Sequence, residues 1–403
     1  MISKEQKIEE LLTRGVAEVI DRDRLKARLL SGEVLRVKLG IDPTSPHIHL
    51  GRAVLLRKLR DFQELGHQVI FIVGDITGII GDTSDKDAER PMLTQQQVES
   101  NMKNYMEQAF KILDREKTET HYNSEWLSKL GFVELGKMAS VFSLHEFSSR
   151  EVIAKRLSAG QRVSFHEMLY PLFQGYDSVA VRADVELGGT DQRFNLLAGR
   201  HIQPLYEQAP QDILMTNLIL GTDGRKMSSS WGNTITLTDV PNEMFGKMMS
   251  IPDELIMDYF VHCTRVPMEE IGKIAEEIVT GANPRDAKLR LAKEIVTLYH
   301  GAEEAEKAET YFVETFSKKQ IPDDIMEQKV AWSAATDGYE NMELFIARIG
   351  LAESRSDARR KIEQGGVSID GEKVVAGSAV FSKELHDGKV MKVGKKDFVR
   401  IIF

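Results

Sequence analysis

The sequence predicts an α/β fold in which a Rossmann-like domain with a mainly parallel sheet is followed by a helical domain and a small α+β module. Three observations support this prediction. A strand, a loop, a helix and a strand succeed one another between residues 34 and 73, residues 241–316 carry a charge-rich helical pattern, and residues 341–403 combine helical and strand patterns. Alternation of strands with helices favours a parallel sheet that is covered by helices.

The first strand–helix–strand unit contains a loop that is a candidate ligand site. Val34–Ile41 has the pattern of a strand, and two prolines in the next five residues prevent regular pairing from continuing. After Gly51 apolar residues recur at helical spacing up to Gly66, which is suited to end a helix, and Val69–Val73 is the next strand. Because ligands of such folds bind outside the carboxyl ends of the strands, this loop is expected to face the site.

Two later segments carry further element signals. Thr94 and Gln97 fit a capping box, and apolar residues from Val98 to Leu113 lie on one face of the helix that it would start. The stretch from Val179 to Leu187 alternates apolar with polar residues, which favours a strand ending at the following two glycines, although its first half is also compatible with a helix. The end of this strand is expected to face the same site as the loop.

With 403 residues, the chain is too long for one hydrophobic core, so several domains are expected. We predict a Rossmann-like domain over residues 1–235, a helical domain over 236–329, a linker over 330–340 and a small module over 341–403. Few apolar residues recur periodically between 320 and 341, which is typical of a linker. The small module is expected to contain two helices and short strands near 367–369 and 390–393.

Composition and charge exclude several classes of protein. The net charge of −9 argues against nonspecific binding to nucleic acid, yet residues 341–403 carry 12 Lys and Arg against 9 Asp and Glu. The single cysteine, Cys263, cannot form an intrachain disulfide or a cysteine-based zinc site, and it is expected to be a small buried residue. No apolar run is long enough to span a membrane, and the polar start lacks a signal core, so a cytoplasmic protein is expected.

Two short motifs are suited to phosphate chemistry. His47–Arg52 lies where a loop meets the start of a helix, and the free backbone donors and the helix dipole there favour an anion. Gly224–Ser230 is a glycine-led loop with one motif lysine and three hydroxyl groups, which could follow a phosphate group as it moves. Either motif alone is common in solvated surface loops.

Together, in this order and about 175 positions apart, the two motifs resemble the HIGH and KMSKS signatures of class I aminoacyl-tRNA synthetases. Gly40–Thr44, Tyr170–Asp177 and Gly188–Gln192 resemble the tyrosyl members of that class, and Gly350–Lys373 resembles the α-L RNA-binding module of ribosomal proteins and of bacterial tyrosyl enzymes. The resemblance implies that the chain activates L-tyrosine with ATP and Mg²⁺, transfers the tyrosine to the 3′ end of tRNA(Tyr), and is a homodimer.

The resemblance also implies roles for individual residues. A buried Asp177 could accept a hydrogen bond from the tyrosine hydroxyl, and this contact would make the absence of that hydroxyl costly. The tyrosine-binding residues implied are Lys38, Asp82, Tyr170, Gln174, Asp177 and Gln192. The ATP-binding residues implied are Asp42, Thr44, His49, Gly51, Gly189, Asp191, Lys226, Met227 and Ser229, and the catalytic ones are His49, Arg52, Lys86, Arg90, Lys226 and Ser229. RNA binding is expected at Arg355, Arg359, Arg360 and Lys361, and no resident metal site is expected.

Three positions depart from the family pattern. Arg52 replaces the usual histidine of the first signature, and Ser229 replaces the second lysine of the other, so pyrophosphate is expected to be held differently. Lys38 stands where many members carry a tyrosine, and it could donate to the substrate hydroxyl or only pair with Asp177.

Three other functions are compatible with parts of the sequence. A tryptophanyl enzyme would share both signatures, but it has less reason to keep Asp177 and does not usually carry the tail module. A small-molecule nucleotidyltransferase would not need a basic RNA-binding tail. A noncatalytic RNA-binding paralogue would have broken phosphate contacts, which Arg52 and Ser229 favour and which His49, Lys226, Asp82 and Asp191 oppose.

Overall fold

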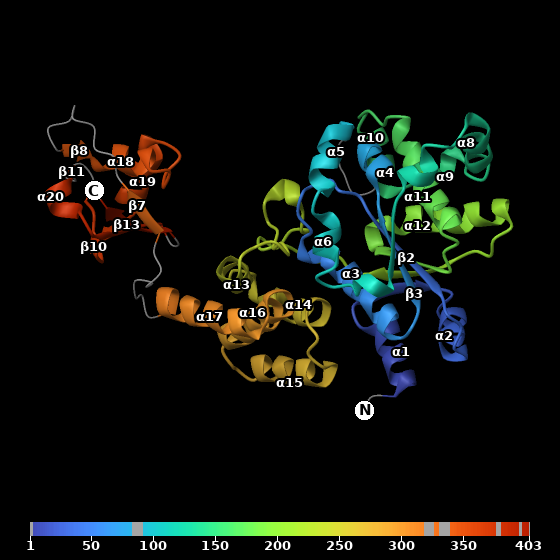
Figure 1. Ribbon diagram of the computed structural model, residues 1–403, viewed down its shortest axis with the longest axis horizontal. Coiled ribbons are helices and arrows are strands. Elements are labelled where there is room, and N and C mark those ends of the chain that lie inside the picture. The colour runs from blue at the N-terminus through green and yellow to red at the C-terminus, as the bar shows by residue number, and fades with distance from the viewer. Residues whose placement is uncertain are drawn as a thin grey trace. The chain divides into compact units, whose positions relative to one another are not determined.

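The computed structural model describes residues 3–82, 92–317, 326–329, 339–375, 380–394 and 397–402. The chain divides into two compact units, Met1–Glu309 and Thr310–Phe403. Figure 1 shows the sheet and most of the helices in the first unit. The functional motifs around Asp42, Asp177 and Lys226 all belong to this first unit.

A six-stranded sheet forms the centre of the first unit, with the order β1-β6-β5-β2-β3-β4. Its strands are β1 (Val16–Ile20), β2 (Arg36–Ile41), β3 (Gln68–Val73), β4 (Thr118–Tyr122), β5 (Val185–Gly189) and β6 (Asp212–Thr216). Every pairing is parallel except that of β1 with β6. The predicted Rossmann-like, mainly parallel sheet is therefore confirmed.

The strand order places a switch point between β2 and β5. From β2 the chain continues to β3 on one side, and from β5 it continues to β6 on the other, while β2 and β5 pair directly. The connecting segments therefore diverge at the carboxyl ends of β2 and β5 and leave a crevice there, which is the usual ligand position in open α/β sheets.

Twelve α-helices of the described chain accompany this sheet. They are α1 (Lys4–Thr13), α2 (Arg22–Ser31), α3 (Leu50–Glu64), α4 (Asp75–Ile80), α5 (Gln95–Met102), α6 (Tyr105–Ala109), α7 (Ser124–Leu127), α8 (Phe132–Ala139), α9 (Leu144–Ser148), α10 (Glu151–Ser158), α11 (His166–Ala180) and α12 (Arg193–Ile202). A Cβ atom at Gly175 of α11 would come 3.1 Å from the backbone of Ala198 in α12. The glycine thus permits the close packing of α11 on α12, and α11 carries Tyr170, Gln174 and Asp177.

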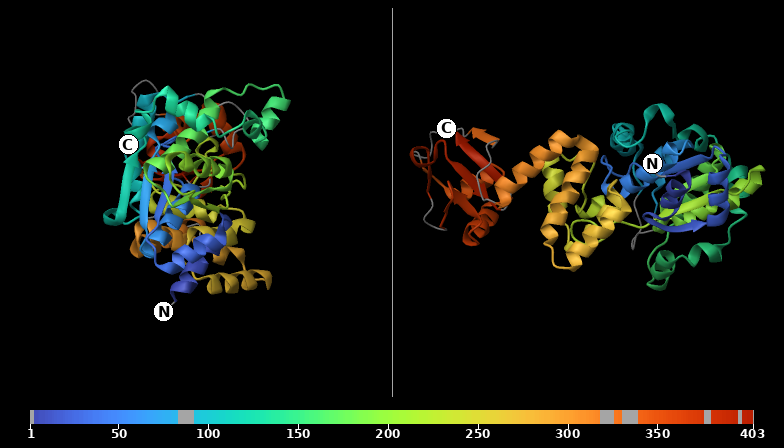
Figure 2. Two further views of the ribbon diagram at one scale, coloured as in Figure 1. Left: turned by 90° about the vertical axis from the view of Figure 1, so that its right-hand side faces the viewer. Right: turned by 90° about the horizontal axis from the view of Figure 1, so that it is seen from below.

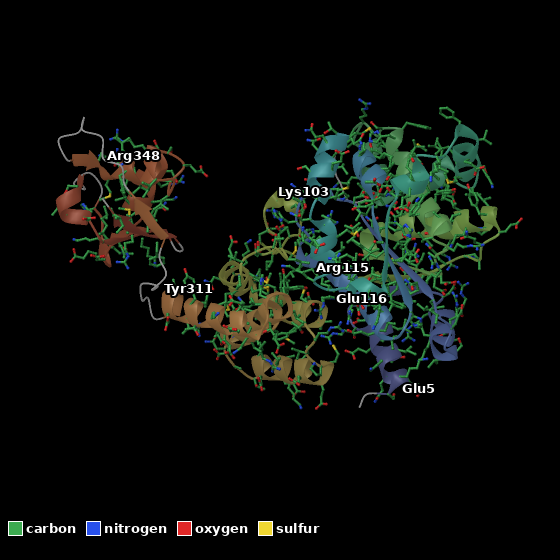
Figure 3. The ribbon with its side chains drawn as sticks, viewed as in Figure 1. Glu5, Lys103, Arg115, Glu116, Tyr311 and Arg348 are labelled. Carbon is green, nitrogen blue, oxygen red and sulfur yellow. The ribbon has the colours of Figure 1, made fainter. Side chains whose placement is uncertain are left out.

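Two expected elements differ in the structure. The predicted helix from 98 to 113 begins at the confirmed capping box but divides into α5 and α6, because Asn104 leaves helical geometry with φ −118° and ψ 15°. Lys103, labelled in Figure 3, lies at this break, and the turn buries Tyr105. The alternating residues before β5 complete α11 and a turn in which Arg182 has φ +51°, so the helical alternative for that stretch is correct.

Residues 241–309 form a helical bundle, drawn in yellow to orange in Figure 2. Its helices are α13 (Pro241–Met249), α14 (Ile256–Cys263), α15 (Met268–Val279), α16 (Pro284–His300) and α17 (Ala302–Phe312), the last of which continues to the unit boundary and beyond. The predicted helical character is confirmed, and Cys263 is buried as expected. Among the described residues, no helix is long and apolar enough to cross a membrane.

The second unit is a small α+β module, as predicted. It contains β7 (Met326–Lys329), β8 (Tyr339–Asn341), α18 (Met342–Arg348), α19 (Arg355–Glu363), β9 (Val367–Ile369), β10 (Glu372–Lys373), β11 (Val380–Ser382), α20 (Lys383–His386), β12 (Val390–Val393) and β13 (Asp397–Ile402). Arg348, labelled in Figure 3, ends α18 and lies over the ring of Phe345. Buried residues of α18, α19, β9 and β12 form a separate core.

The segment from 320 to 341, expected to be a linker, contains two strands. β7 pairs in parallel with β13, and β8 pairs with β11. Residues 330–338 of the predicted linker lie outside the described residues. The strands escaped prediction because they are only 4 and 3 residues long and gain their hydrogen bonds from partners far along the sequence.

Candidate active site

A cavity of about 700 Å³ opens at the carboxyl ends of β2, β5 and β6, where the switch point predicts a site. Almost all the predicted tyrosine and ATP residues of the described chain line it: Asp42, Thr44, His49, Gly51, Arg52, Asp82, Tyr170, Gln174, Asp177, Gly189, Asp191, Gln192, Lys226, Met227 and Ser229. The structure thus brings together residues that are up to 187 positions apart, counting from Asp42 to Ser229. Lys86 and Arg90 lie outside the described residues.

Asp177 is a buried carboxylate on the cavity wall, and its side chain is held by two residues of the β4–α7 region. Its Oδ1 accepts a hydrogen bond from the indole Nε1 of Trp126 at 2.7 Å, and its Oδ2 accepts one from the amide of Asn123 at 3.3 Å. Burial raises the pKa of Asp177 to about 7, against the opposing effects of the Lys38 charge and of these hydrogen bonds. The carboxylate is therefore fixed in orientation and costly to leave without a partner.

A second carboxylate of the cavity wall, the partly buried Asp42, follows β2. It accepts hydrogen bonds from the hydroxyl of Tyr170 at 2.9 Å and from that of Thr77 at 2.7 Å. Burial raises the pKa of Asp42 to about 6. A Cβ atom at Gly74 would lie 2.1 Å from Asp42, so only glycine at position 74 leaves room for this carboxylate. Asp42 thereby fixes the Tyr170 hydroxyl at the cavity wall.

Asp82 is a third carboxylate that lines the cavity. Its Oδ2 accepts from the Gln192 amide at 2.6 Å, and its Oδ1 accepts from the Asn195 amide at 3.3 Å. Asn195 also donates to Gln192 at 3.0 Å. The start of α12 therefore holds an anionic group and a carboxamide next to each other on the wall.

The first motif forms the amino end of α3. His49 caps this helix, and burial, followed by the charges of Arg52 and Lys226, lowers the pKa of His49 to about 3, so the ring is neutral at pH 7. Its Nδ1 has no hydrogen-bond partner in the described part of the chain. A Cβ atom at Gly51 would come 3.1 Å from the His49 ring, so glycine allows this ring to cover the start of the helix.

Arg52 is tied to the loop that precedes its helix. It donates to the Thr44 hydroxyl at 2.8 Å and to the Asp42 carbonyl at 3.1 Å, and it also bonds to the hydroxyl of Tyr105. The guanidinium group therefore shapes the Asp42–Thr44 turn as well as bringing positive charge to the cavity.

The second motif lies in a loop, residues 221–233, that we call the Lys226 loop. Lys226 Nζ lies 2.8 Å from Oδ2 of Asp191, and the backbone of Met227 bonds to Ile219 at 3.0 Å. Asn233 closes the loop by donating to the Lys226 carbonyl at 3.0 Å and accepting from the Ser228 amide at 2.9 Å. Ser229 is exposed, and its hydroxyl donates to the Ser45 hydroxyl at 3.1 Å.

The expectation for Lys38 needs correction. Lys38 does not line the cavity, and its Nζ donates to Glu186 at 2.9 Å, to Ser178 at 2.7 Å and to the Gln174 carbonyl at 3.0 Å. An ammonium group has three donors, so Lys38 has none left for a substrate hydroxyl. Its ion-pair partner is Glu186 and not Asp177. The sequence does not reveal this partner, because Glu186 follows only the alternating pattern of a strand and meets Lys38 through the pairing of β2 with β5.

Sequence comparison decides the family. A family model for class I tRNA synthetases (W and Y) matches residues 30–317, and an S4 domain model matches residues 344–380. A tyrosine–tRNA ligase of Carboxydothermus hydrogenoformans is 48% identical over 400 residues, covering 98% of this chain and 97% of its own. One of Thermotoga maritima is 46% identical over 397 residues, covering 97% and 96%.

The chain belongs to the tyrosyl-tRNA synthetase family.

Solved structures of this family share the fold of the first unit. A tyrosyl-tRNA synthetase of Archaeoglobus fulgidus, complexed with L-tyrosine, is similar with a TM-score of 0.61 and 25% identity, covering 76% of this chain and all of that one. A C-terminally truncated mitochondrial enzyme of Aspergillus nidulans is similar in fold, with a TM-score of 0.64 and 24% identity over 75% of this chain and 92% of its own.

Several residues that contact the site residues are not indicated by the family motifs in the sequence. Trp126, Asn123, Thr77 and Asn195 orient the predicted carboxylates, yet none lies in either signature motif. Thr77, Trp126 and Asn195 lie on the helices α4, α7 and α12, and Asn123 follows the edge strand β4. Only the hydrogen-bonding needs of buried carboxylates indicate that such partners exist, and these needs do not identify them.

The four predicted RNA-binding residues lie on α19. Arg355, Arg359 and Arg360 are more than half exposed, although each pairs with a nearby carboxylate. Lys361 instead donates to the Leu351 carbonyl at 3.0 Å and pairs with Asp357, so part of its role is structural. Among the described residues of both units, no group of three His, Cys, Asp or Glu side chains could hold a metal ion.

Proposed function

We propose that this tyrosyl-tRNA synthetase family member activates L-tyrosine with ATP and transfers the tyrosine to the 3′ end of tRNA(Tyr). The observation that carries the choice of amino acid is Asp177, a buried carboxylate that Trp126 and Asn123 orient on the cavity wall. A phenol hydroxyl would give this carboxylate a donor that a phenylalanine side chain lacks. An indole would place its N–H elsewhere, which disfavours the tryptophanyl alternative.

The remaining amino-acid contacts are assigned by charge and position on the cavity wall. Asp82, Tyr170 and Gln174 offer an anion and neutral acceptors to the substrate ammonium group. Gln192, which donates to Asp82 in the structure, would turn a donor toward the substrate carboxylate. The reacting carboxylate is thereby directed toward the nucleotide half of the cavity.

The nucleotide half lies between the two signature motifs. Asp191 is assigned to the ribose hydroxyl groups, and Gly189 leaves room for the nucleotide against the end of β5. The phosphate-side residues are Asp42, Thr44, His49, Gly51 and Arg52 on one flank, and Lys226, Met227 and Ser229 on the other. Lys86 and Arg90 are assigned to the same phosphates through their place in the sequence. Mg²⁺ enters as part of the ATP substrate, held mainly by its phosphate oxygens.

The reaction needs positioning and charge and no covalent nucleophile of the protein. An oxygen of the tyrosine carboxylate forms a bond to the α-phosphorus, the bond from that phosphorus to the pyrophosphate oxygen breaks, and pyrophosphate leaves with the electron pair. Cations placed around pyrophosphate stabilise the charge that grows on it. In the second step the oxygen of the terminal ribose hydroxyl of tRNA forms a bond to the tyrosyl carbonyl carbon and releases its proton, while the bond from that carbon to the AMP phosphate oxygen breaks and AMP leaves with the electron pair.

The S4 region, with exposed arginines on α19, is assigned to tRNA binding. We also propose a homodimer, since large apolar side chains of the α8–α11 region are exposed in the single chain: Phe132, Val133, Leu144, Leu157 and Phe165. We propose that the protein acts in the cytoplasm, where ATP, tyrosine and tRNA are present together.

Charging of bacterial tRNA with each of the twenty amino acids tests the proposal. Tyrosine alone should be attached. Attachment of tryptophan would support the second candidate. If the chain binds tRNA but attaches none of the twenty amino acids, it is a noncatalytic paralogue.

A further inference from the structure

A buried ion pair lies directly behind the amino-acid side of the cavity. Lys38 of β2 and Glu186 of β5 are register neighbours on adjacent parallel strands, with their charged atoms 2.9 Å apart and both side chains 1% exposed. Desolvation largely cancels the attraction within such a pair, so it is a weak source of stability. Its importance lies in the groups that it holds.

The hydrogen bonds of the pair converge on α11. Lys38 donates to the Ser178 hydroxyl at 2.7 Å and to the Gln174 carbonyl at 3.0 Å. Glu186 accepts from the Gln174 amide Nε2 at 3.0 Å, from the Ser178 hydroxyl at 3.2 Å and from the amide of Gln211. All three donors of Lys38 and both oxygens of Glu186 are therefore occupied, and the network has one geometry.

This network determines which end of the Gln174 amide is available to a ligand. A carboxamide has a donor end and an acceptor end, and the donor end of Gln174 is bound to the buried Glu186. The acceptor oxygen is the end left for the cavity, whose wall Gln174 helps to form. An acceptor there attracts an ammonium group, whereas the reversed amide would present N–H groups that repel it.

We propose that Glu186, held by Lys38, is a positioning residue that fixes the Gln174 amide with its acceptor toward the ammonium group of the amino acid. The inference rests on the proposed function and deepens it, because it adds two residues behind the site that set affinity for one part of the substrate. Neither residue touches the substrate.

The test uses the double variant Lys38→Met/Glu186→Gln of the full chain, which leaves no unpaired buried charge. A glutamine at 186 can accept from Gln174 or donate to it, so the orientation of Gln174 is no longer imposed. Two inhibitors of tyrosine-dependent pyrophosphate exchange serve as probes: tyramine, which has the phenol and the ammonium group, and 3-(4-hydroxyphenyl)propionate, which has the phenol but no ammonium group.

The inhibition constant of tyramine should rise roughly tenfold, the effect of about one hydrogen bond to a charged group, while that of the propionate stays within about twofold. Asp212→Asn is the matched control. Asp212 is a fully buried carboxylate on the neighbouring strand β6, paired with Arg24 at 2.9 Å, and its loss should affect both inhibitors equally little.

Equal weakening of both inhibitors in the double variant would show a general structural role and overturn the inference, as would no weakening of either. The melting temperature of each variant confirms that it is folded. If the unaltered chain fails to catalyse tyrosine-dependent exchange, the proposed function fails instead, and direct calorimetric binding of the two probes still tests the positioning role.

Discussion

Lys226 Nζ lies 2.8 Å from Oδ2 of Asp191. The lysine of the second motif is therefore paired with the carboxylate that we propose binds the ribose hydroxyl groups of ATP. The pair is partly exposed, and such pairs are worth little in water. We expect ATP binding to separate this pair, so that Lys226 turns toward the phosphates. Within the Lys226 loop, Gly224 and Gly232 lie on either side of Lys226 with φ +78° and +66°, and glycine at such positions gives the backbone room for this change.

We expect Lys226→Ala to slow adenylate formation about 100-fold or more, while the KM for ATP changes by less than about threefold. The lysine is paired within the protein before ATP binds and is needed most when charge develops on pyrophosphate. Single-turnover formation of tyrosyl-adenylate at varied ATP measures both quantities. Arg225→Ala is the control on the same loop, because Arg225 pairs with Asp223. An unchanged rate with weakened ATP binding would assign Lys226 to ground-state binding.

Ser229→Lys, which restores the residue usual in the family, should be tolerated. Ser229 is exposed, and its contact with Ser45 is a single hydroxyl hydrogen bond, so a longer side chain can extend from the cavity wall into solvent. The exchange rate should remain within about tenfold of the original. Complete loss of activity in a folded variant would mean that position 229 is limited in space when ATP is bound.

Asp177 should make stability depend on pH. Its folded pKa of about 7 lies above its ordinary value of 3.8, so the folded chain holds the proton more tightly, and this contribution to stability is lost as pH rises through about 7. Asp177→Asn removes the ionisation. Its melting temperature, relative to that of the original chain, should therefore increase between pH 6 and pH 9, by the equivalent of about 1.4 kcal/mol, because about one pH unit separates pH 6 from the folded pKa. A difference that is the same at both pH values would contradict the raised pKa.

Ending the chain after Ser317 should spare adenylate formation and abolish tRNA charging. The cut leaves the sheet, the cavity and α17 intact and removes the S4 region. It is cleaner than a cut after Lys329, because β7 belongs to the sheet of the second unit. Pyrophosphate exchange and charging are measured on the same preparation. Loss of exchange in a folded truncated chain would show that the tail contributes to the first step.

Much of the fold was accessible from the sequence because local patterns determine it. The prolines after β2, the glycine after α3 and the apolar run of β3 each have a local physical meaning, and the structure confirms the unit that they predict. The brief strand β7 was missed because its hydrogen bonds depend on β13, some 70 residues later. The end of α11 was ambiguous because apolar residues at a helix end and in the following turn imitate the alternation of a strand.

The site, like the fold, contains some residues that the sequence predicts and others that it does not. Residues inside motifs, such as His49 and Lys226, could be found from the resemblance, and the structure brings them to one cavity. The partners that orient them could not be found. Trp126 lies 51 positions from Asp177, and Glu186 meets Lys38 across two strands, so only the folded chain juxtaposes them. From the sequence, Lys38 could donate to the substrate hydroxyl or pair with Asp177, whereas in the structure it pairs with Glu186.

The ratio of kcat/KM for tyrosine to that for phenylalanine, in pyrophosphate exchange with the original chain and with Asp177→Ala, tests the central claim most directly. Phenylalanine cannot supply the hydrogen bond that the tyrosine hydroxyl would add to those from Trp126 and Asn123, and this penalty should make the original chain prefer tyrosine strongly. In the variant that penalty is absent, and the ratio should fall by roughly tenfold to a hundredfold or more, mainly through slower use of tyrosine. If the ratio is unchanged in a folded Asp177→Ala variant, Asp177 does not recognise the hydroxyl group and our account of the amino-acid site is wrong.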